Sequence, residues 1–144
     1  MSNLPAVCID ASIVVDRILQ RRDARLGQYW HEWKTARRAL IAPSLLYYEV
    51  TNVFYQKLKK GEITDSEVRK ALSLVAGLSI KLYEETGLHE KAVQIAQESG
   101  LAATYDAHYL ALAWQEGAEF YTRDARFARA VQGSFGFVRL IEQS

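Results

Sequence analysis

Short apolar segments alternate along the chain with longer segments in which apolar residues recur every three or four positions. The short segments have the length and composition of strands buried on both faces, and the longer ones have the periodicity of amphipathic helices. Strands that alternate with helices require crossover connections, so the pattern predicts a parallel sheet covered by helices on both faces. We therefore predict an α/β fold in a single domain over residues 1–144, with its folded part between about Pro5 and Ile141.

Five strands and seven helices are expected from this pattern. The strands are placed at residues 6–9, 40–42, 80–83, 119–122 and 137–140, with the last as a candidate edge strand. The helices are placed from about residue 12, and at about 25–39, 44–60, 64–77, 88–99, 104–117 and 124–131. Ser44 and Thr104 are expected to cap their helices, and Thr64 is expected to form a capping box with Glu67.

The composition excludes several classes of protein. The chain has 18 Lys and Arg against 17 Asp and Glu, so it lacks the strongly basic charge of a general nucleic-acid coat protein. Its single cysteine, Cys8, excludes an intramolecular disulfide and fits a reducing compartment. No apolar run approaches the roughly 18 residues that a membrane span needs. We expect a cytoplasmic protein with no membrane segment.

Four acidic residues stand in apolar or aromatic surroundings. Asp10 follows the first strand, Asp124 joins a strand to a helix, and Asp106 lies in the first turn of a helix. Parallel sheets form sites outside the carboxyl ends of their strands and beside helix N-termini, so the three aspartates are expected along one edge. Glu49 lies in mid-helix with apolar neighbours three and four residues away, and it is expected to point inward with Asn52 on the same side.

Each aspartate taken alone is better explained as a helix cap or an Asx-turn, but that explanation leaves Glu49 unaccounted for. Two unit charges about 4 Å apart repel by roughly 4 kcal/mol at an effective dielectric near 20, so converging carboxylates need a cation between them. Oxygen donors without cysteine or histidine favour Mg²⁺ or Mn²⁺ over zinc. The histidines have no ligand spacing and are interpreted as structural or surface residues; they are His31, His89 and His108.

An all-carboxylate site that holds Mg²⁺ or Mn²⁺ suits the hydrolysis of phosphodiester bonds. The sequence has no nucleophile elbow, no Walker loop and no dinucleotide-binding glycine motif. A receiver-like signalling domain, with Mg²⁺ around a phosphoacceptor aspartate, is an alternative. It requires paired acids after the first strand and a lysine after the last, and the sequence shows neither pattern.

The four acids lie in four segments, which are 8–12, 43–52, 105–113 and 121–124. In order and spacing these segments resemble the motifs of PIN-domain proteins, and in particular the VapC-type toxins of prokaryotic toxin–antitoxin pairs. The resemblance covers essentially the whole chain. It implies an Mg²⁺- or Mn²⁺-dependent endoribonuclease that cleaves RNA, with Asp10, Glu49, Asp106 and Asp124 as catalytic and metal-binding residues. It also implies a homodimer and a VapB-like antitoxin partner; a PIN-like binding module without activity is the alternative.

Three further positions match the family's pattern, and Arg123 departs from it. Ser12 and Thr122 correspond to hydroxyl positions near the metal site, and Asn52 corresponds to a position that is often polar. Arg123 stands where a small residue is commoner; Arg123 and Arg126 are candidate contacts to substrate phosphates because both lie within a turn of Asp124.

An apolar stripe in the second helix is made by Leu26, Trp30 and Trp33. A stripe of this kind is typical of a core, and part of it is also a candidate groove for an amphipathic antitoxin helix. When the four inward acids are set aside, 13 acidic residues remain against 18 basic ones, which is an excess of five positive charges. The near-neutral total therefore agrees with a basic exterior around one acidic pocket.

Overall fold

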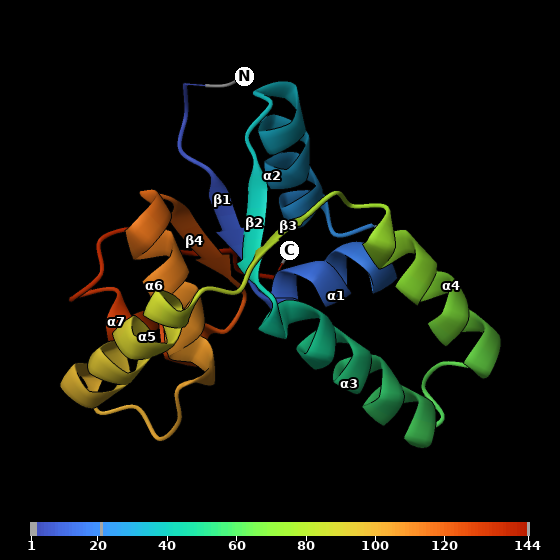
Figure 1. Cartoon of the computed structure of the whole chain (residues 1–144). Coiled ribbons are helices and arrows are strands. Elements are labelled where there is room, and N and C mark those ends of the chain that lie inside the picture. The colour runs from blue at the N-terminus through green and yellow to red at the C-terminus, as the bar shows by residue number, and fades with distance from the viewer. Residues whose placement is uncertain (1–2, 21, 144) are drawn as a thin grey trace.

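The computed structural model describes residues 3–20 and 22–143, and these residues form five strands and seven helices (Figure 1). The strands are β1 (Val7–Ile9), β2 (Leu40–Pro43), β3 (Lys81–Tyr83), β4 (Glu119–Thr122) and β5 (Val138–Leu140). The helices are α1 (Ala11–Leu19), α2 (Ala24–Thr35), α3 (Leu45–Lys59), α4 (Asp65–Ala76), α5 (Thr86–Ser99), α6 (Tyr105–Glu116) and α7 (Ala125–Val131). The predicted α/β class is confirmed.

The strands form one parallel sheet in the order β3-β2-β1-β4-β5. β5 therefore lies at an edge, as the sequence suggested, and β3 forms the other edge. Ile9 pairs with Tyr121, and Pro43 pairs with Tyr83. The carboxyl ends of the four strands β3, β2, β1 and β4 consequently line one edge of the sheet.

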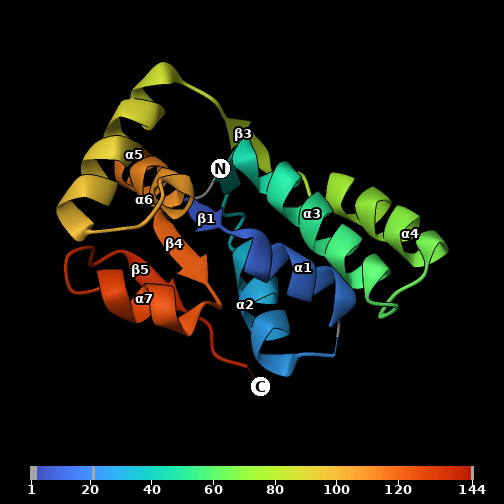
Figure 2. The ribbon, with the colours of Figure 1, turned by 90° about the horizontal axis from the view of Figure 1, so that it is seen from below.

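Helices cover both faces of the sheet (Figure 2). On one face α6 packs against β1, β2 and β4, and α5 lies against α6. On the other face α1 contacts β4 and also packs against α2, α3 and α4. Every residue of β1 and β2 is buried, as expected for the central strands of a covered parallel sheet. Among the described helices, none combines the length and apolar character required to cross a bilayer.

The aromatic stripe of α2 belongs to the core. Leu26, Trp30 and Trp33 are all buried, and the Trp33 ring meets the ring of Tyr121 edge to face with 4.9 Å between centroids. Aromatic pairs in this geometry contribute about 0.5–1.5 kcal/mol beyond their burial. The core interpretation is confirmed, whereas the idea that part of the stripe forms an exposed groove is wrong.

Some helix ends differ from the expected ones. α2 ends at Thr35 instead of residue 39, because Arg37 takes a left-handed backbone conformation with φ of 55°. Arg38 then turns back to β4, where its Nη2 lies 2.5 Å from Glu119 Oε1. α5 begins two residues early, at Thr86.

The predicted helix caps have mixed outcomes. The capping box of Thr64 and Glu67 is present at α4, with both hydrogen bonds formed. The caps expected at Ser44 and Thr104 are wrong, because neither side chain bonds to the first turn of its helix. Both residues have helical backbone angles, and an N-cap hydroxyl normally reaches the helix from an extended backbone.

Candidate active site

The predicted aspartates gather at the carboxyl edge of the sheet. Asp10 directly follows β1, and Asp124 follows β4 after one intervening residue. Because β1 and β4 are neighbours with Ile9 paired to Tyr121, the two segments leave the sheet side by side. Asp106 lies in the first turn of α6, the helix that packs across β1, β2 and β4. The sheet and one covering helix therefore bring three carboxylates from distant parts of the sequence to the same edge of the sheet.

Two hydroxyl groups hold the carboxylate of Asp10. Ser12 Oγ donates to Asp10 Oδ1 and Thr122 Oγ1 donates to Asp10 Oδ2, each at 2.5 Å. Each hydroxyl also accepts a backbone N–H of the β4–α7 turn: Arg123 N donates to Ser12 Oγ and Asp124 N to Thr122 Oγ1, both at 3.0 Å. This network fixes the Asp10 carboxylate relative to the turn that carries Asp124.

Glu49 reaches the site from α3 and is held by a tyrosine of α6. The phenol of Tyr109 donates to Glu49 Oε1 at 2.5 Å. Tyr109 is only 1% exposed, so its hydroxyl group has a fixed position in the core. Burial and the neighbouring Glu49 carboxylate both raise the pKa of Tyr109, so the phenol stays protonated and remains a donor. The sequence pattern placed Glu49 correctly on the inward side of its helix.

The electrostatics show that the carboxylates are close enough to repel one another. Burial raises the pKa of Asp10 to about 6, although hydrogen bonds from Ser12, Thr122 and the Ile13 N–H act in the opposite direction, and the charge of Asp106 raises it further. Burial and the Asp124 carboxylate raise the pKa of Asp106. Burial also raises the pKa of Glu49, and the Asp106 charge contributes. A cation among these groups would relieve both the desolvation and the repulsion.

Helix capping accounts for part of this arrangement. Asp10 caps α1 by accepting the Ile13 N–H at 3.2 Å, and Asp124 caps α7 by accepting the Phe127 N–H at 3.0 Å. Asp106 lies inside its helix and caps nothing. A carboxylate has about four lone-pair sites, so a single cap bond leaves most of its acceptor capacity for a ligand. The capping explanation is therefore correct for two of the acids without excluding a second role.

A family model described as the PIN domain matches residues 7–132. The chain belongs to the PIN domain family. PIN domains are generally nucleases.

Two solved structures share the fold of this PIN domain. A "Toxin-antitoxin complex from Klebsiella pneumoniae" is 18% identical with a TM-score of 0.67, covering 96% of this chain and 100% of the other. The protein PAE2754 from Pyrobaculum aerophilum is 22% identical with a TM-score of 0.62, covering 94% and 91%. No curated protein matches significantly.

The donor chemistry of this PIN domain fits a divalent cation such as Mg²⁺ or Mn²⁺. The candidate ligands Asp10, Glu49, Asp106 and Asp124 supply oxygen donors only, which hard cations prefer. Within residues 3–20 and 22–143, no three Asp, Glu, His or Cys side chains stand close enough together to surround an ion. The four carboxylates thus match the ion in charge and chemistry, and closing them around it requires side-chain movement.

Other predicted site residues lie elsewhere. The guanidinium of Arg123 is buried, with Nη2 2.7 Å from Asp23 Oδ2 and Nε 3.4 Å from Asp16 Oδ2. The expectation that Arg123 contacts a substrate phosphate is wrong, because this side chain faces the α1–α2 side of the core. Asn52 is exposed and its Oδ1 accepts from Gln56 at 3.5 Å, so it does not share the inward side with Glu49. Arg126 is exposed on α7 and stays a candidate contact.

Sequence reasoning missed Tyr109 as a site residue. A signal was available, since Tyr109 lies three residues after Asp106 and therefore on the same side of the predicted helix. A buried tyrosine also needs a hydrogen-bond partner for its hydroxyl, and an inward glutamate needs a donor. The Tyr109 hydroxyl needs an acceptor and the Glu49 carboxylate needs a donor, which together predict the hydrogen bond that the structure shows.

Proposed function

We propose that this PIN domain is an Mg²⁺- or Mn²⁺-dependent endoribonuclease that hydrolyses phosphodiester bonds of RNA. The observation that carries the proposal is the group of carboxylates around Asp10, in which burial and neighbouring charges raise the pKa of Asp10, Glu49 and Asp106. A fold that keeps desolvated like charges together sacrifices stability, and such clusters mark functional sites. The excess of five positive charges outside the cluster favours a polyanionic substrate.

Each acid has a defined part in the proposed mechanism. Asp10, Glu49, Asp106 and Asp124 are the residues that would hold the cation. A bound Mg²⁺ or Mn²⁺ supplies charge neutralisation at the phosphate and lowers the pKa of water toward neutrality. Ser12 and Thr122 keep the Asp10 oxygens oriented, and Tyr109 does the same for Glu49. Asp106 and Asp124 are exposed to solvent and therefore accessible to a phosphodiester.

Metal removal is the direct test of this proposal. Purified chain incubated with total cellular RNA is expected to produce discrete cleavage products with Mg²⁺ or Mn²⁺ and none in excess EDTA, with activity restored when the metal is returned. Mapping the new RNA ends measures the result. Undiminished cleavage in EDTA would contradict metal dependence, and RNA binding without cleavage under any metal condition would favour a catalytically silent binding module.

We further propose that the chain acts in the cytoplasm as a homodimeric toxin with a VapB-like antitoxin. The support is the fold, which the chain shares with a protein in a toxin–antitoxin complex. Expression of the active chain alone is expected to arrest growth, and co-expression of the product of an adjacent small reading frame is expected to restore it. Size-exclusion chromatography with light scattering measures the oligomeric state. Unimpaired growth with active enzyme present would contradict the toxin assignment.

A Tyr109→Phe variant tests how Glu49 is positioned. The phenyl ring still fills the buried site, but the hydrogen bond to Glu49 is lost, so we expect RNA cleavage to fall about 10–100-fold and Mn²⁺ affinity to weaken. The variant is expected to lose only about 1 kcal/mol of unfolding free energy. Calorimetric titration with Mn²⁺ separates a metal-site effect from a folding effect.

Tyr121→Phe is the matched control for that variant. Tyr121 is also buried and its hydroxyl also faces a carboxylate, Glu119 at 3.4 Å, but Glu119 begins β4 and lies away from the acids. This control is expected to cleave RNA and bind Mn²⁺ like the wild-type chain. If Tyr109→Phe and Tyr121→Phe cleave RNA at the same rate and bind Mn²⁺ with the same affinity, the Tyr109 hydroxyl does not position Glu49.

A further inference from the structure

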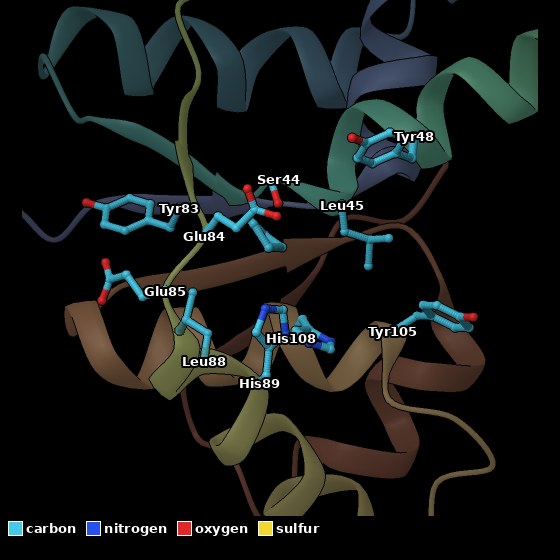
Figure 3. A pocket seen from close by; sticks show the side chains of 11 residues that line it. Ser44, Leu45, Tyr48, Tyr83, Glu84, Glu85, Leu88, His89, Tyr105 and His108 are labelled. Carbon is cyan, nitrogen blue, oxygen red and sulfur yellow. Dashed lines mark hydrogen bonds between the residues drawn. The ribbon is translucent and has the colours of Figure 1, made fainter.

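A cavity of about 260 Å³ lies beside the candidate active site, between the N-terminal ends of α3, α5 and α6 (Figure 3). Its wall includes Tyr48 from α3 and Tyr105 from α6. Each of these tyrosines stands one residue before a proposed metal-binding acid, Glu49 or Asp106. A group held in the cavity is therefore adjacent to the carboxylates but does not occupy their place.

The two tyrosines present aromatic surface to solvent. Tyr48 is 75% exposed and Tyr105 is 62% exposed, and Figure 3 shows both at one end of the cavity, near Leu45. Large aromatic rings are generally buried, and exposed rings beside a hollow are a common feature of sites that bind single-stranded nucleic acids. Every nucleobase has a flat face that can stack on such rings.

The side chains that line the cavity provide no lysine or arginine to hold a phosphate. The eleven lining residues include Glu84 and Glu85. Glu85 Oε2 accepts a hydrogen bond from Gln115 at 3.3 Å, whereas the Glu84 side chain extends toward Ser44 in the cavity wall (Figure 3). A carboxylate repels phosphate and accepts hydrogen bonds from N–H groups. The wall thus suits an uncharged flat ring that carries N–H donors.

A pair of histidines adds a second acceptor. Nδ1 of His108 lies 2.7 Å from the Thr104 carbonyl, which can only accept, so His108 carries its proton on Nδ1. Nε2 of His108 and Nδ1 of His89 share a hydrogen bond with 2.9 Å between the two nitrogens. When His108 carries a proton on Nδ1 alone, His89 is the donor in this bond and its Nε2 is left to accept from a ligand. His89 and Glu84 both line the cavity and both favour a donor on the bound group.

We infer that this cavity binds one nucleobase of single-stranded RNA next to the scissile phosphodiester, with the base stacked on Tyr48 and Tyr105 and its amino group facing Glu84 and His89. The inference rests on the proposed ribonuclease function and extends it to substrate choice. Adenine, cytosine and guanine carry an exocyclic amino group, and uracil does not. An amino group offers two N–H donors, one for each acceptor, whereas uracil offers a single ring N–H, so the cavity favours amino-bearing bases over uracil.

Binding of short RNAs in EDTA tests the inference without any cleavage. Fluorescence anisotropy is measured for labelled oligoadenylate, oligocytidylate and oligouridylate of equal length with the full chain. Tyr48→Ala and Tyr105→Ala are each expected to weaken oligoadenylate binding about 10-fold, and Tyr48→Phe and Tyr105→Phe are expected to retain it because the ring remains. The wild-type chain is expected to bind oligoadenylate and oligocytidylate about 10-fold more tightly than oligouridylate, and Glu84→Gln to reduce that preference.

Tyr55→Ala is the matched control, because Tyr55 lies on the same helix and is 53% exposed but does not line the cavity. Its affinity for oligoadenylate is expected to equal that of the wild-type chain.

Wild-type affinity in both alanine variants, or no binding of any oligonucleotide by the wild-type chain, would overturn the inference. Either result would favour a protein partner as the occupant of the cavity. Equal affinities for the three RNAs would overturn the amino-group preference. If the wild-type chain binds as expected but cleaves no RNA with metal present, the nuclease proposal fails and the base pocket stands.

Discussion

An Asp10→Asn variant is expected to lose more than about 100-fold of the RNA-cleaving activity and to unfold at a higher temperature than the wild-type chain. Changing a group that only orients a metal ligand already costs about 10–100-fold, so loss of a ligand exceeds that range. Asparagine is as good an N-cap as aspartate and can still accept the Ile13 N–H. The fold therefore keeps its cap and loses a desolvated negative charge, although the amide nitrogen cannot accept the hydroxyl hydrogen bond that the second Asp10 oxygen accepts.

The stability gain has a defined pH dependence. Burial raises the pKa of Asp10 from 3.8 to about 6, so the folded state favours the protonated acid and its ionisation destabilises the fold. The wild-type chain and the variant are thus expected to be equally stable near pH 4, and the variant becomes more stable as the pH rises through 6. A shift of this size corresponds to about 1–3 kcal/mol at pH 7, measured by urea unfolding at both pH values.

Two controls separate charge at the site from charge in general. Asp65→Asn removes a carboxylate that is 67% exposed on α4 and paired with Arg69, and it is expected to leave activity and the pH dependence unchanged. Mn²⁺ is expected to raise the melting temperature of the wild-type chain and not that of Asp10→Asn, because a bound ligand stabilises only a state that binds it. Full activity of Asp10→Asn with Mn²⁺ would remove Asp10 from the proposed ligand set.

The features that the sequence predicted correctly are those with local causes. The strand at β1 follows from an uninterrupted apolar run, and the capping box at α4 follows from Thr64 and Glu67 three residues apart. The inward direction of Glu49 follows from its apolar neighbours on one helical face. The placement of Asp10 and Asp124 at one edge of the sheet follows from a general property of parallel sheets, which line up the carboxyl ends of their strands.

The features that the sequence missed depend on contacts between distant segments. The left-handed backbone of Arg37 ends α2, and nothing in an arginine side chain signals that conformation. Arg123 was expected to contact a substrate phosphate because it lies within a turn of Asp124. Its partners Asp16 and Asp23 are about a hundred positions away in the chain, so the burial of Arg123 becomes visible only in the folded structure.

The network around Asp10 and the ion pairs of Arg123 meet in one turn. The backbone N–H of Arg123 donates to Ser12, which holds Asp10, while its side chain extends to the opposite side, toward α1 and α2. The guanidinium also donates to the Glu142 carbonyl at 2.8 Å, which ties down the segment after β5. One residue therefore anchors the turn that carries Asp124 to three other parts of the fold.

An Arg123→Met variant is consequently expected to lose about 3–5 kcal/mol of unfolding free energy. Methionine keeps much of the aliphatic bulk, but the carboxylate of Asp23, whose side chain is 5% exposed, remains buried without the guanidinium charge. Removing one partner of a buried ion pair has a destabilising effect of this size. Urea unfolding at pH 7 measures it, and the remaining folded fraction is expected to cleave RNA more slowly because the Asp124 turn is less firmly held.

Arg126→Met is the control for Arg123→Met, since Arg126 is an exposed arginine three residues later, and its loss is expected to change stability by less than about 0.5 kcal/mol. The double variant Arg123→Met, Asp23→Asn removes the buried charge together with its partner and is expected to recover part of the lost stability. If Arg123→Met were as stable as Arg126→Met, the guanidinium would contribute no net stabilisation. If the double variant were no more stable than the single one, lost packing and not the uncompensated Asp23 charge would explain the effect.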